Sequence, residues 1–329
     1  MMSFIGALPG AISQGLIWGI MAIGVYITYK ILDIADLTVD GSFCTGGAVF
    51  VMLYAALPHE LSPLAAAGWM VLILLAATGA GMLAGLVTGL LHTVCGIPAI
   101  LAGILTQLGL WSVNLAIMDM KSNVAINILD KRTLDRLLVS LRFVRGVAVG
   151  DYPVYRYPIL VVGLFTVAVI AILYWFFGTE LGASLRATGA NQAMARAQGI
   201  NTNTGKVLGL MISNGLVALS GALLSQFQSF ADSSMGKGAI VIGLAAVIIG
   251  EVLFSKIFRN FALKLLAVSI GAIIYYVVIQ AVVSLSNIHT NYLKLISAVI
   301  VALFLSVPYW KGRYFTKVSP AGKEAGTRA

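Results

Sequence analysis

Residues 158–177, PILVVGLFTVAVIAILYWFF, form an apolar stretch that no charged side chain interrupts. At about 1.5 Å per residue, a helix of this length spans about 30 Å, the thickness of the hydrocarbon core of a bilayer. Similar stretches recur along the whole chain. The candidate spans are residues 9–29, 42–57, 66–91, 98–119, 158–177, 204–228, 238–254, 264–285 and 293–310. The second and seventh are short and could be discontinuous or re-entrant, so the sequence predicts about nine spans, with eight to ten possible.

The composition agrees with a membrane protein. Of the 329 residues, 60% are hydrophobic and 10% are charged, and the mean hydropathy is +0.97. Soluble domains carry about 25% charged residues, and one core could not hide this much apolar surface. We therefore expect an all-α, polytopic transmembrane helical bundle formed by residues 1–310 as one domain, followed by a basic tail at 311–329.

The basic residues predict an orientation. Counting spans places three basic segments on one side of the membrane: residues 178–206, residues 255–264 and the tail after Trp310. The positive-inside rule makes that side cytoplasmic. The C-terminus is then inside and, with nine spans, the N-terminus is outside. The same count places residues 120–157 on the extracytoplasmic side, although they hold seven basic residues. This placement is acceptable because long segments obey the rule less strictly.

The most informative polar segment is Gly178–Asn203, GTELGASLRATGANQAMARAQGINTN, which lies between two apolar spans. Its alanine-rich part, Ala190–Gln198, favours a short helix. Asn191 is suited to cap the N-terminus of that helix, and Gly199 to end it in a left-handed conformation. A plain solvated connector is the alternative interpretation.

The pattern T-x-x-G-x-x-L-R-A-T-G-x-N-x-x-x-A-R-x-x-G-I in this segment resembles the coupling-helix segment of ABC transporter permeases of the branched-chain amino acid and ribose/simple-sugar type. DLTVDGSF at Asp36–Phe43 resembles the DLSVG-type turn of the same permeases. Leu210–Gln228 and Ile240–Glu251 look closest to the aromatic amino acid (tryptophan/tyrosine-type) subgroup. The resemblance implies a type II-like importer permease, and it assigns contact with the ATP-binding subunit to Arg186, Thr188, Gly189, Asn191, Ala195, Arg196 and Gly199.

The same resemblance implies the partners: an ATP-binding cassette subunit, an extracytoplasmic substrate-binding protein, a second copy of the chain and the bilayer of a bacterial cytoplasmic (inner) membrane. It implies import of a small solute, and the subgroup that the chain looks closest to implies an aromatic amino acid. ATP would be bound and hydrolysed by the partner, so we expect no cofactor and no catalytic activity in this chain.

The residues support these expected absences. The segment Gly199–Val207, GINTNTGKV, fails as a P-loop, because five residues separate its glycines and Val207 replaces the magnesium-binding Ser or Thr. The three histidines lie far apart and form no metal-ligand pattern, so no metal site is expected. The basic residues form no continuous stripe with interleaved aromatics, which argues against nucleic-acid binding.

Polar side chains inside the spans are candidates for the translocation pathway. Such groups need partners in hydrocarbon, and they therefore face neighbouring helices or a water-filled path. The candidates are Asp36, Asp40, Gln107, Asn114, Asn214 and Ser225. Interhelical hydrogen bonding remains open for the amides and the serine, and helix capping from a cytoplasmic loop remains open for the two aspartates. Asn214 and Ser225 are about three helical turns apart and should share a face.

Glycine spacing predicts close helix packing. Gly81, Gly85 and Gly89 repeat every four residues, as do Gly15 and Gly19, so each set lines one helix face. A self-contained secondary transporter or channel is the alternative function. It would need an ionisable site near the midplane and often inverted repeats, whereas this sequence shows no repeat and almost no central charge. An intramembrane enzyme would need paired catalytic residues, and none stand out.

Overall fold

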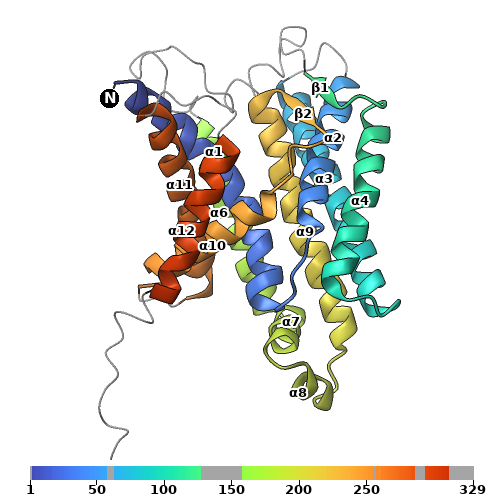
Figure 1. Ribbon diagram of the computed structural model, residues 1–329. Coiled ribbons are helices and arrows are strands. Elements are labelled where there is room, and N and C mark those ends of the chain that lie inside the picture. Colours follow the sequence, from blue (N-terminus) through green and yellow to red (C-terminus); the bar gives the residue numbers. More distant parts are fainter. Residues whose placement is uncertain are drawn as a thin grey trace, which may run out of the picture.

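The computed structural model describes residues 2–57, 63–126, 158–254, 257–258, 260–285 and 293–310, and this part of the chain is almost entirely helical (Figure 1). The helices are α1 (Met2–Tyr26), the π-helical turn η1 (Ile27–Ile31), α2 (Val39–Ala55), α3 (Pro63–Thr93), α4 (Ala99–Ile117), α6 (Pro158–Gly178), α7 (Glu180–Ala190), α8 (Gln192–Ala197), α9 (Thr202–Gln228), α10 (Ala239–Phe254), α11 (Phe261–Leu285) and α12 (Leu293–Trp310). Two short strands, β1 (Asn123–Ala125) and β2 (Phe230–Asp232), pair antiparallel.

Each predicted span coincides with a helix, which confirms the all-α polytopic class. Six helical segments are long and apolar enough to cross a membrane. Helices α2 and α10, from the two short stretches, are shorter, as is the apolar part of α12. Many large apolar side chains on the outside of the bundle are exposed, among them Leu83, Leu164 and Trp175. A surface of this kind is suited to lipid.

The helices form an inverted repeat that the sequence did not disclose. A long helix, a break, a short helix and two further helices occur in that order as α1–α4 and again as α9–α12. Helix α1 runs from the end that carries β1 and β2 toward the end that carries α7 and α8, whereas α9 runs the opposite way (Figure 1). The packing follows the same symmetry, because α3 lies along α9 and α11 lies along α1.

A short sequence match marks the equivalent breaks of the two halves. Ala35-Asp36-Leu37-Thr38 precedes α2, and Ala231-Asp232-Ser233-Ser234 precedes α10. In each, the aspartate Oδ1 accepts the backbone N–H two residues later, from Thr38 at 2.9 Å and from Ser234 at 2.7 Å. Both turns are therefore Asx turns at the same place in the repeat.

Glycines allow the closest helix contacts, as predicted. A Cβ atom on Gly81 would meet the carbonyl oxygen of Asn214, and one on Gly85 would meet that of Leu210. On α1, a Cβ atom on Gly15 would lie 2.7 Å from the Cα of Ile273 in α11. These are backbone contacts that no larger residue permits, and they bring the two halves of the repeat together.

The segment after α6 contains more helix than predicted. We expected one helix over Ala190–Gln198, whereas α7 covers Glu180–Ala190 and α8 covers Gln192–Ala197. Glycines 182 and 189 lower helix propensity by about 1 kcal/mol each, but here their backbones pack tightly. A Cβ atom on Gly182 would meet the backbone of Phe177, and one on Gly189 would meet the carbonyl oxygen of Ile31. Tertiary packing therefore outweighs the local preference.

Candidate translocation site and coupling surface

Asp36 lies in the break between η1 and α2, inside the bundle. Its side chain is buried, with only 2% of the residue exposed. One carboxylate oxygen accepts the N–H of Thr38, and the other accepts a hydrogen bond from the Asn214 amide at 2.7 Å. Asp36 is therefore a buried carboxylate with one hydrogen-bond donor at each oxygen, and the interpretation as an aspartate in a cytoplasmic loop is wrong for it.

Asn214 connects three elements. Its Nδ2 donates to Asp36 and, at 3.0 Å, to the carbonyl of Leu210, while its Oδ1 accepts from the Ser42 hydroxyl at 2.6 Å. All of its hydrogen-bonding groups are engaged within the bundle. Asn214 thus holds the break, α2 and α9 together, which favours interhelical hydrogen bonding over pathway lining.

Ser225, like Asn214, contacts α2. A Cβ atom on Gly47 of α2 would contact the Ser225 hydroxyl, just as Ser42 of α2 contacts Asn214. The Ser225 hydroxyl lies 3.7 Å from the sulfur of Met235, and the residue is fully buried. It belongs to the α2–α9 contact.

Three threonines that the sequence analysis did not single out extend this buried network. The hydroxyls of Thr38 and Thr88 lie 2.7 Å apart, and Thr88 donates to Thr106 at 2.9 Å. They link the start of α2 to α3 and α4. A threonine hydroxyl in a helix can also donate to the backbone carbonyl four residues earlier, as Thr106 does to Ala102. The sequence alone therefore does not show which threonines bond to another helix.

Asp40 joins the two short helices of the repeat. It lies in the first turn of α2, and its carboxylate accepts the N–H of Gly238 at 2.9 Å and that of Ile240 at 3.0 Å. These donors belong to the N-terminal end of α10, where a negative charge is favoured by the helix dipole. The N-terminal ends of α2 and α10 therefore meet inside the bundle at one carboxylate.

A groove of about 250 Å³ opens beside Asp40. It brings together three of the predicted pathway residues, Asp40, Gln107 and Asn114, but not Asp36, Asn214 or Ser225. The remaining lining comes from α2, α4 and the turn between β2 and α10. These residues are Gly41, Cys44, Leu108, Trp111, Ser233 and Lys237.

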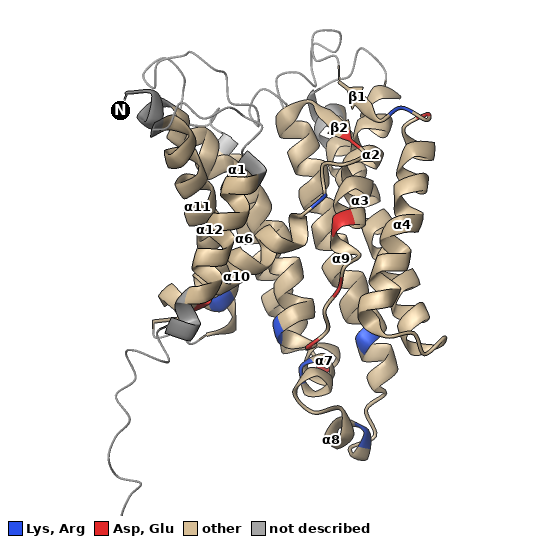
Figure 2. Ribbon diagram, in the orientation of Figure 1, with Lys and Arg blue, Asp and Glu red and all other residues tan. Residues whose placement is uncertain are grey.

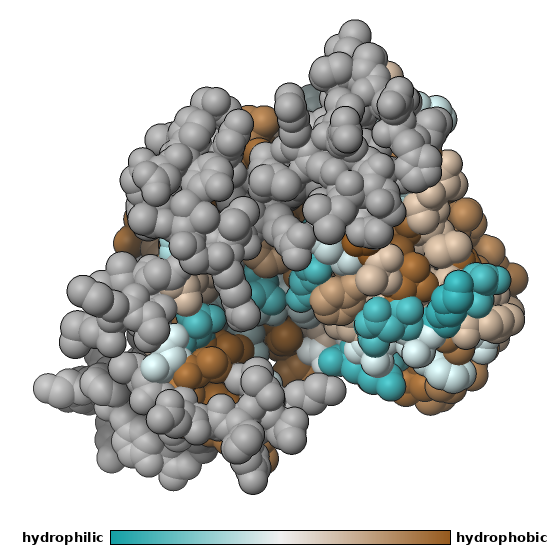
Figure 3. Space-filling model, turned by 90° about the horizontal axis from the view of Figure 1, so that it is seen from above, coloured by the Kyte–Doolittle hydropathy of each residue, from teal (hydrophilic) through white to brown (hydrophobic). Residues whose placement is uncertain are grey.

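Figure 3 views the molecule from the end that carries β1 and β2, and hydrophilic side chains lie beside apolar ones in the part that the described residues form. Asp232 lies here, outside the spanning helices. Burial alone would raise the pKa of its carboxyl group, but hydrogen bonds from the Ser234 hydroxyl and N–H and from Asn123, together with the charge of Lys237, outweigh it, so the pKa is lowered. This aspartate is an anion that fixes the turn leading to α10.

The opposite end carries α7 and α8, which project beyond the spanning helices (Figure 1). The Thr179 hydroxyl caps α7, and the Asn191 side chain accepts the N–H of Met194 at 3.0 Å and caps α8. Gly199 follows α8 with a φ of +81°. The cap and the left-handed glycine lie where the sequence predicted them.

Contacts with the bundle hold this pair of helices in place, and the predicted coupling residues divide accordingly. Thr188 and Ala195 are buried, and Gly189 packs on η1. Arg186 and Arg196 are exposed, and the Nε of Arg196 donates to Thr202 at 2.8 Å, which ties α8 to α9. Thr188, Gly189 and Ala195 therefore position the α7–α8 pair, whereas the two arginines lie on its surface.

The outer surface of α7 and α8 also carries apolar side chains. Leu181 and Met194 are 60% and 59% exposed although they lie beyond the spanning helices. An exposed combination of large apolar groups and arginines is typical of a protein-protein contact.

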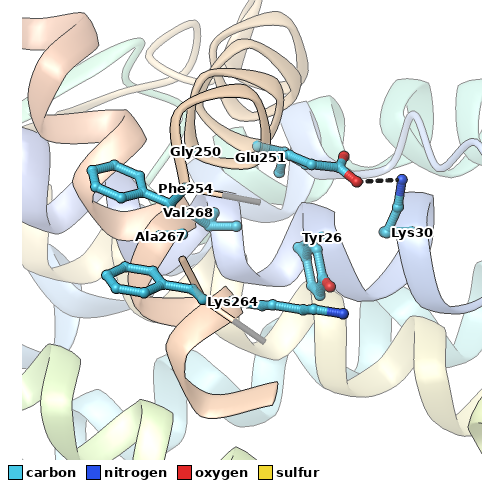
Figure 4. Close-up of a pocket in the computed structure, with 10 residues that line it drawn as sticks. Tyr26, Lys30, Gly250, Glu251, Phe254, Lys264, Ala267 and Val268 are labelled. Carbon is cyan, nitrogen blue, oxygen red and sulfur yellow. Dashed lines mark ion pairs between the residues drawn. The ribbon is translucent and has the colours of Figure 1, made fainter. Parts of the chain in front are cut away.

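A second pocket lies near this end, between η1, α10 and α11 (Figure 4). Lys30 and Glu251 form an ion pair of 2.8 Å across it, and the Lys264 side chain extends toward Tyr26. Both partners of the ion pair are nearly half exposed.

Figure 2 shows that the charges of the described chain gather mostly toward its two ends. No group of three or more potential metal ligands occurs among the described residues.

Comparison with known proteins agrees with this architecture. The family model described as "Branched-chain amino acid transport system / permease component" matches residues 8–306. The chain is 39% identical over 294 residues to the tyrosine transport system permease protein of Clostridioides difficile (strain R20291), covering 89% of this chain and 88% of the relative.

Other relatives are more distant. An uncharacterized protein of Rickettsia prowazekii (strain Madrid E) is 33% identical over 298 residues, with 90% of this chain and 95% of the relative covered. The autoinducer 2 import system permease protein LsrC of Yersinia pestis (strain Pestoides F) is 28% identical over 177 residues, with 52% of this chain and 44% of the relative covered. No solved structure matches.

The chain belongs to the family of branched-chain amino acid transport system permease components. It is a multi-pass membrane permease of the ABC type for a small solute, as the family and the spanning helices show together.

Proposed function

We propose that this chain is the membrane subunit of an ATP-driven importer in a bacterial inner membrane, and that it forms the translocation pathway for an aromatic amino acid. The relative from C. difficile is named as a tyrosine transport system permease, which supports the substrate class. The chain itself carries out no chemistry: a partner ATP-binding cassette subunit binds and hydrolyses ATP. A binding protein delivers the solute, and two copies of the chain enclose the pathway.

The projecting pair α7–α8 is the observation that carries the proposal. The pair lies between α6 and α9 in the chain, and it packs on η1 through Gly189. Its outer face presents Arg186, Leu181 and Met194. A force applied there would pass to α9 and η1, and both contact the break that holds Asp36.

This assignment defines the sides of the membrane. The end with α7 and α8 faces the cytoplasm, and α12 returns toward the same end, which makes the C-terminus cytoplasmic. The end with β1 and β2 then faces the binding protein. Of the predicted extracytoplasmic segment 120–157, residues 127–157 lie outside the described part of the chain, as does the predicted tail 311–329. The inverted repeat provides two halves that can rock against each other to open the site on alternate sides.

Replacement of residues 190–198 by a Gly/Ser linker tests the coupling role. The variant should still insert in the membrane but should lose substrate-stimulated ATP hydrolysis in the reconstituted complex. Unchanged stimulation would refute the assignment of α7–α8.

A self-contained secondary transporter is the second candidate. Two observations from the structure support it, neither of which the sequence provided. The fold has an inverted repeat, and Asp36 and Asp40 lie inside the bundle. Secondary transporters often share both features. The two candidates differ in energy source, because only the first requires ATP.

A further inference from the structure

We propose that the groove beside Asp40 is a binding site for the α-ammonium and α-carboxylate groups of a zwitterionic amino acid. This inference rests on the proposed function and adds to it the residues that recognise the substrate.

The inner wall of the groove offers hydrogen-bond acceptors. Each Asp40 carboxylate oxygen accepts one backbone N–H from the α10 end, and each has a second lone pair. Asn114 is 1% exposed, and its Nδ2 donates to the Gly41 carbonyl at 3.3 Å. Its Oδ1 accepts no hydrogen bond within the described part of the chain. A buried amide oxygen without a donor is costly, at about 1–3 kcal/mol, and an ammonium group in the groove would supply that donor.

The rim of the groove offers a cation. Lys237, in the turn before α10, is exposed and lies within no ion-pair distance of a carboxylate among the described residues. Asp40 and Lys237 therefore present opposite charges on one small groove. A zwitterion carries a charge opposite to each of these two groups, whereas a cation meets repulsion from Lys237 and a neutral sugar offers no charge to either group.

The remaining walls are suited to a substrate side chain. Gln107, Trp111 and Asn114 are spaced by four and three residues and so share one face of α4. Leu108 also lines the groove, and both it and Trp111 are at least half exposed. An apolar or aromatic side chain can pack on these two groups while its α-carbon substituents reach Asp40 and Lys237.

The test uses the purified permease in lipid nanodiscs. The binding protein is left out so that the selectivity of the binding protein does not affect the result. A reporter cysteine is introduced as Ser233→Cys in a Cys95→Ser background, which keeps the buried Cys44 of the groove, and the rate of maleimide labelling is measured. The background variant alone reports labelling of buried Cys44. The matched control is Ser122→Cys, because the Ser122 carbonyl accepts the Ser233 N–H but the residue does not line the groove.

L-tyrosine should slow labelling at position 233 and leave position 122 unaffected. Tyramine, which lacks the carboxylate, and 3-(4-hydroxyphenyl)propionate, which lacks the ammonium, should protect only at concentrations about tenfold higher or more, because each loses a charge-assisted hydrogen bond. Adding Lys237→Gln should remove the difference between tyrosine and tyramine.

Equal protection by all three compounds would overturn the proposal in favour of a merely aromatic groove, and no protection would overturn it outright. ATP-dependent tyrosine uptake by the wild-type complex is measured in parallel. Uptake without protection rejects this site and leaves the proposed function intact, whereas absence of ATP-dependent uptake rejects the proposed function. If the cysteine variant does not assemble, uptake by Lys237→Gln decides, and an unchanged KM for tyrosine would overturn the proposal.

Discussion

The Asp40 carboxylate accepts the backbone N–H of Gly238 at 2.9 Å, although the two residues are 198 positions apart in the chain. This hydrogen bond joins the two short helices α2 and α10, which occupy equivalent places in the inverted repeat. It gives each half of the fold a contact with the other at the point where both helices begin. Movement of one half relative to the other must therefore break or carry along this contact.

Asp40→Ala should separate these helix ends more than Asp40→Asn does. The alanine leaves the N–H groups of Gly238 and Ile240 without an acceptor, at a cost of about 1–3 kcal/mol, whereas asparagine keeps one oxygen. Thermal unfolding in detergent should rank wild type above Asp40→Asn and Asp40→Asn above Asp40→Ala. Identical midpoints for all three proteins would show that the Asp40 contact does not stabilise the fold.

Asn214→Leu should destabilise the bundle strongly. It removes the donor to Asp36 and the acceptor of Ser42, and it leaves both of them buried without that partner. Each such loss costs about 1–3 kcal/mol, and more when the group is charged. Ser306→Ala serves as the control, because that hydroxyl is only partly buried and bonds a carbonyl of its own helix. Comparable unfolding midpoints for the two variants would contradict the role given to Asn214.

Gly85→Ala should weaken the packing of α3 on α9, because the new methyl group meets the Leu210 carbonyl. Overpacking of this kind costs roughly 1–3 kcal/mol. Gly79→Ala on the same helix has no atom within 4 Å of the added group, and it should be neutral or slightly stabilising. Detergent melting curves measure both. Equal effects of the two substitutions would mean that the close contact at Gly85 is not needed.

Arg186→Glu combined with Met194→Asp should reduce recovery of the ATP-binding subunit without unfolding the permease, because both side chains are exposed on the projecting helices. Loss of an interface residue of this kind typically costs about 1–2 kcal/mol or more in binding. Lys121→Glu, exposed at the opposite end of the bundle, is the control. Co-purification should fall for the first variant only, and a parallel fall for Lys121→Glu would point to a nonspecific charge effect.

The ion pair between Lys30 and Glu251 should matter little for stability. Both side chains are nearly half exposed, and ion pairs of this kind contribute about 0–1 kcal/mol. Lys30→Met and Glu251→Gln should each shift the unfolding midpoint only slightly, and the double variant should resemble either single one. A large loss in both single variants would indicate that this pair is far less solvated than its exposure implies.

The spans could be predicted from the sequence because each is a long apolar run, and the contact glycines could be predicted because small residues repeat at a helical spacing. Helix α7 was missed because Gly182 and Gly189 lower helix propensity, and only packing against Phe177 and Ile31 compensates. The repeat was missed because its halves share little more than the Ala-Asp-x-Ser/Thr turn.

The site was predictable only in part. A polar residue in an apolar span identifies Asp40, Gln107 and Asn114 as unusual, but not as neighbours. Asp36 and Asn214 look equally unusual in the sequence and prove to be partners of each other. Lys237 has the appearance of an ordinary loop lysine, and only the fold brings the turn that carries it beside α2 and α4.

The most direct test of the central claim is tyrosine uptake into proteoliposomes that contain the purified complex, measured with ATP inside and, separately, without ATP under an imposed ion gradient. The account predicts that an ATP-binding subunit co-purifies with the permease and that uptake requires ATP and its hydrolysis. Purification of the chain alone, with gradient-driven uptake that persists without ATP, would contradict it and establish a secondary transporter.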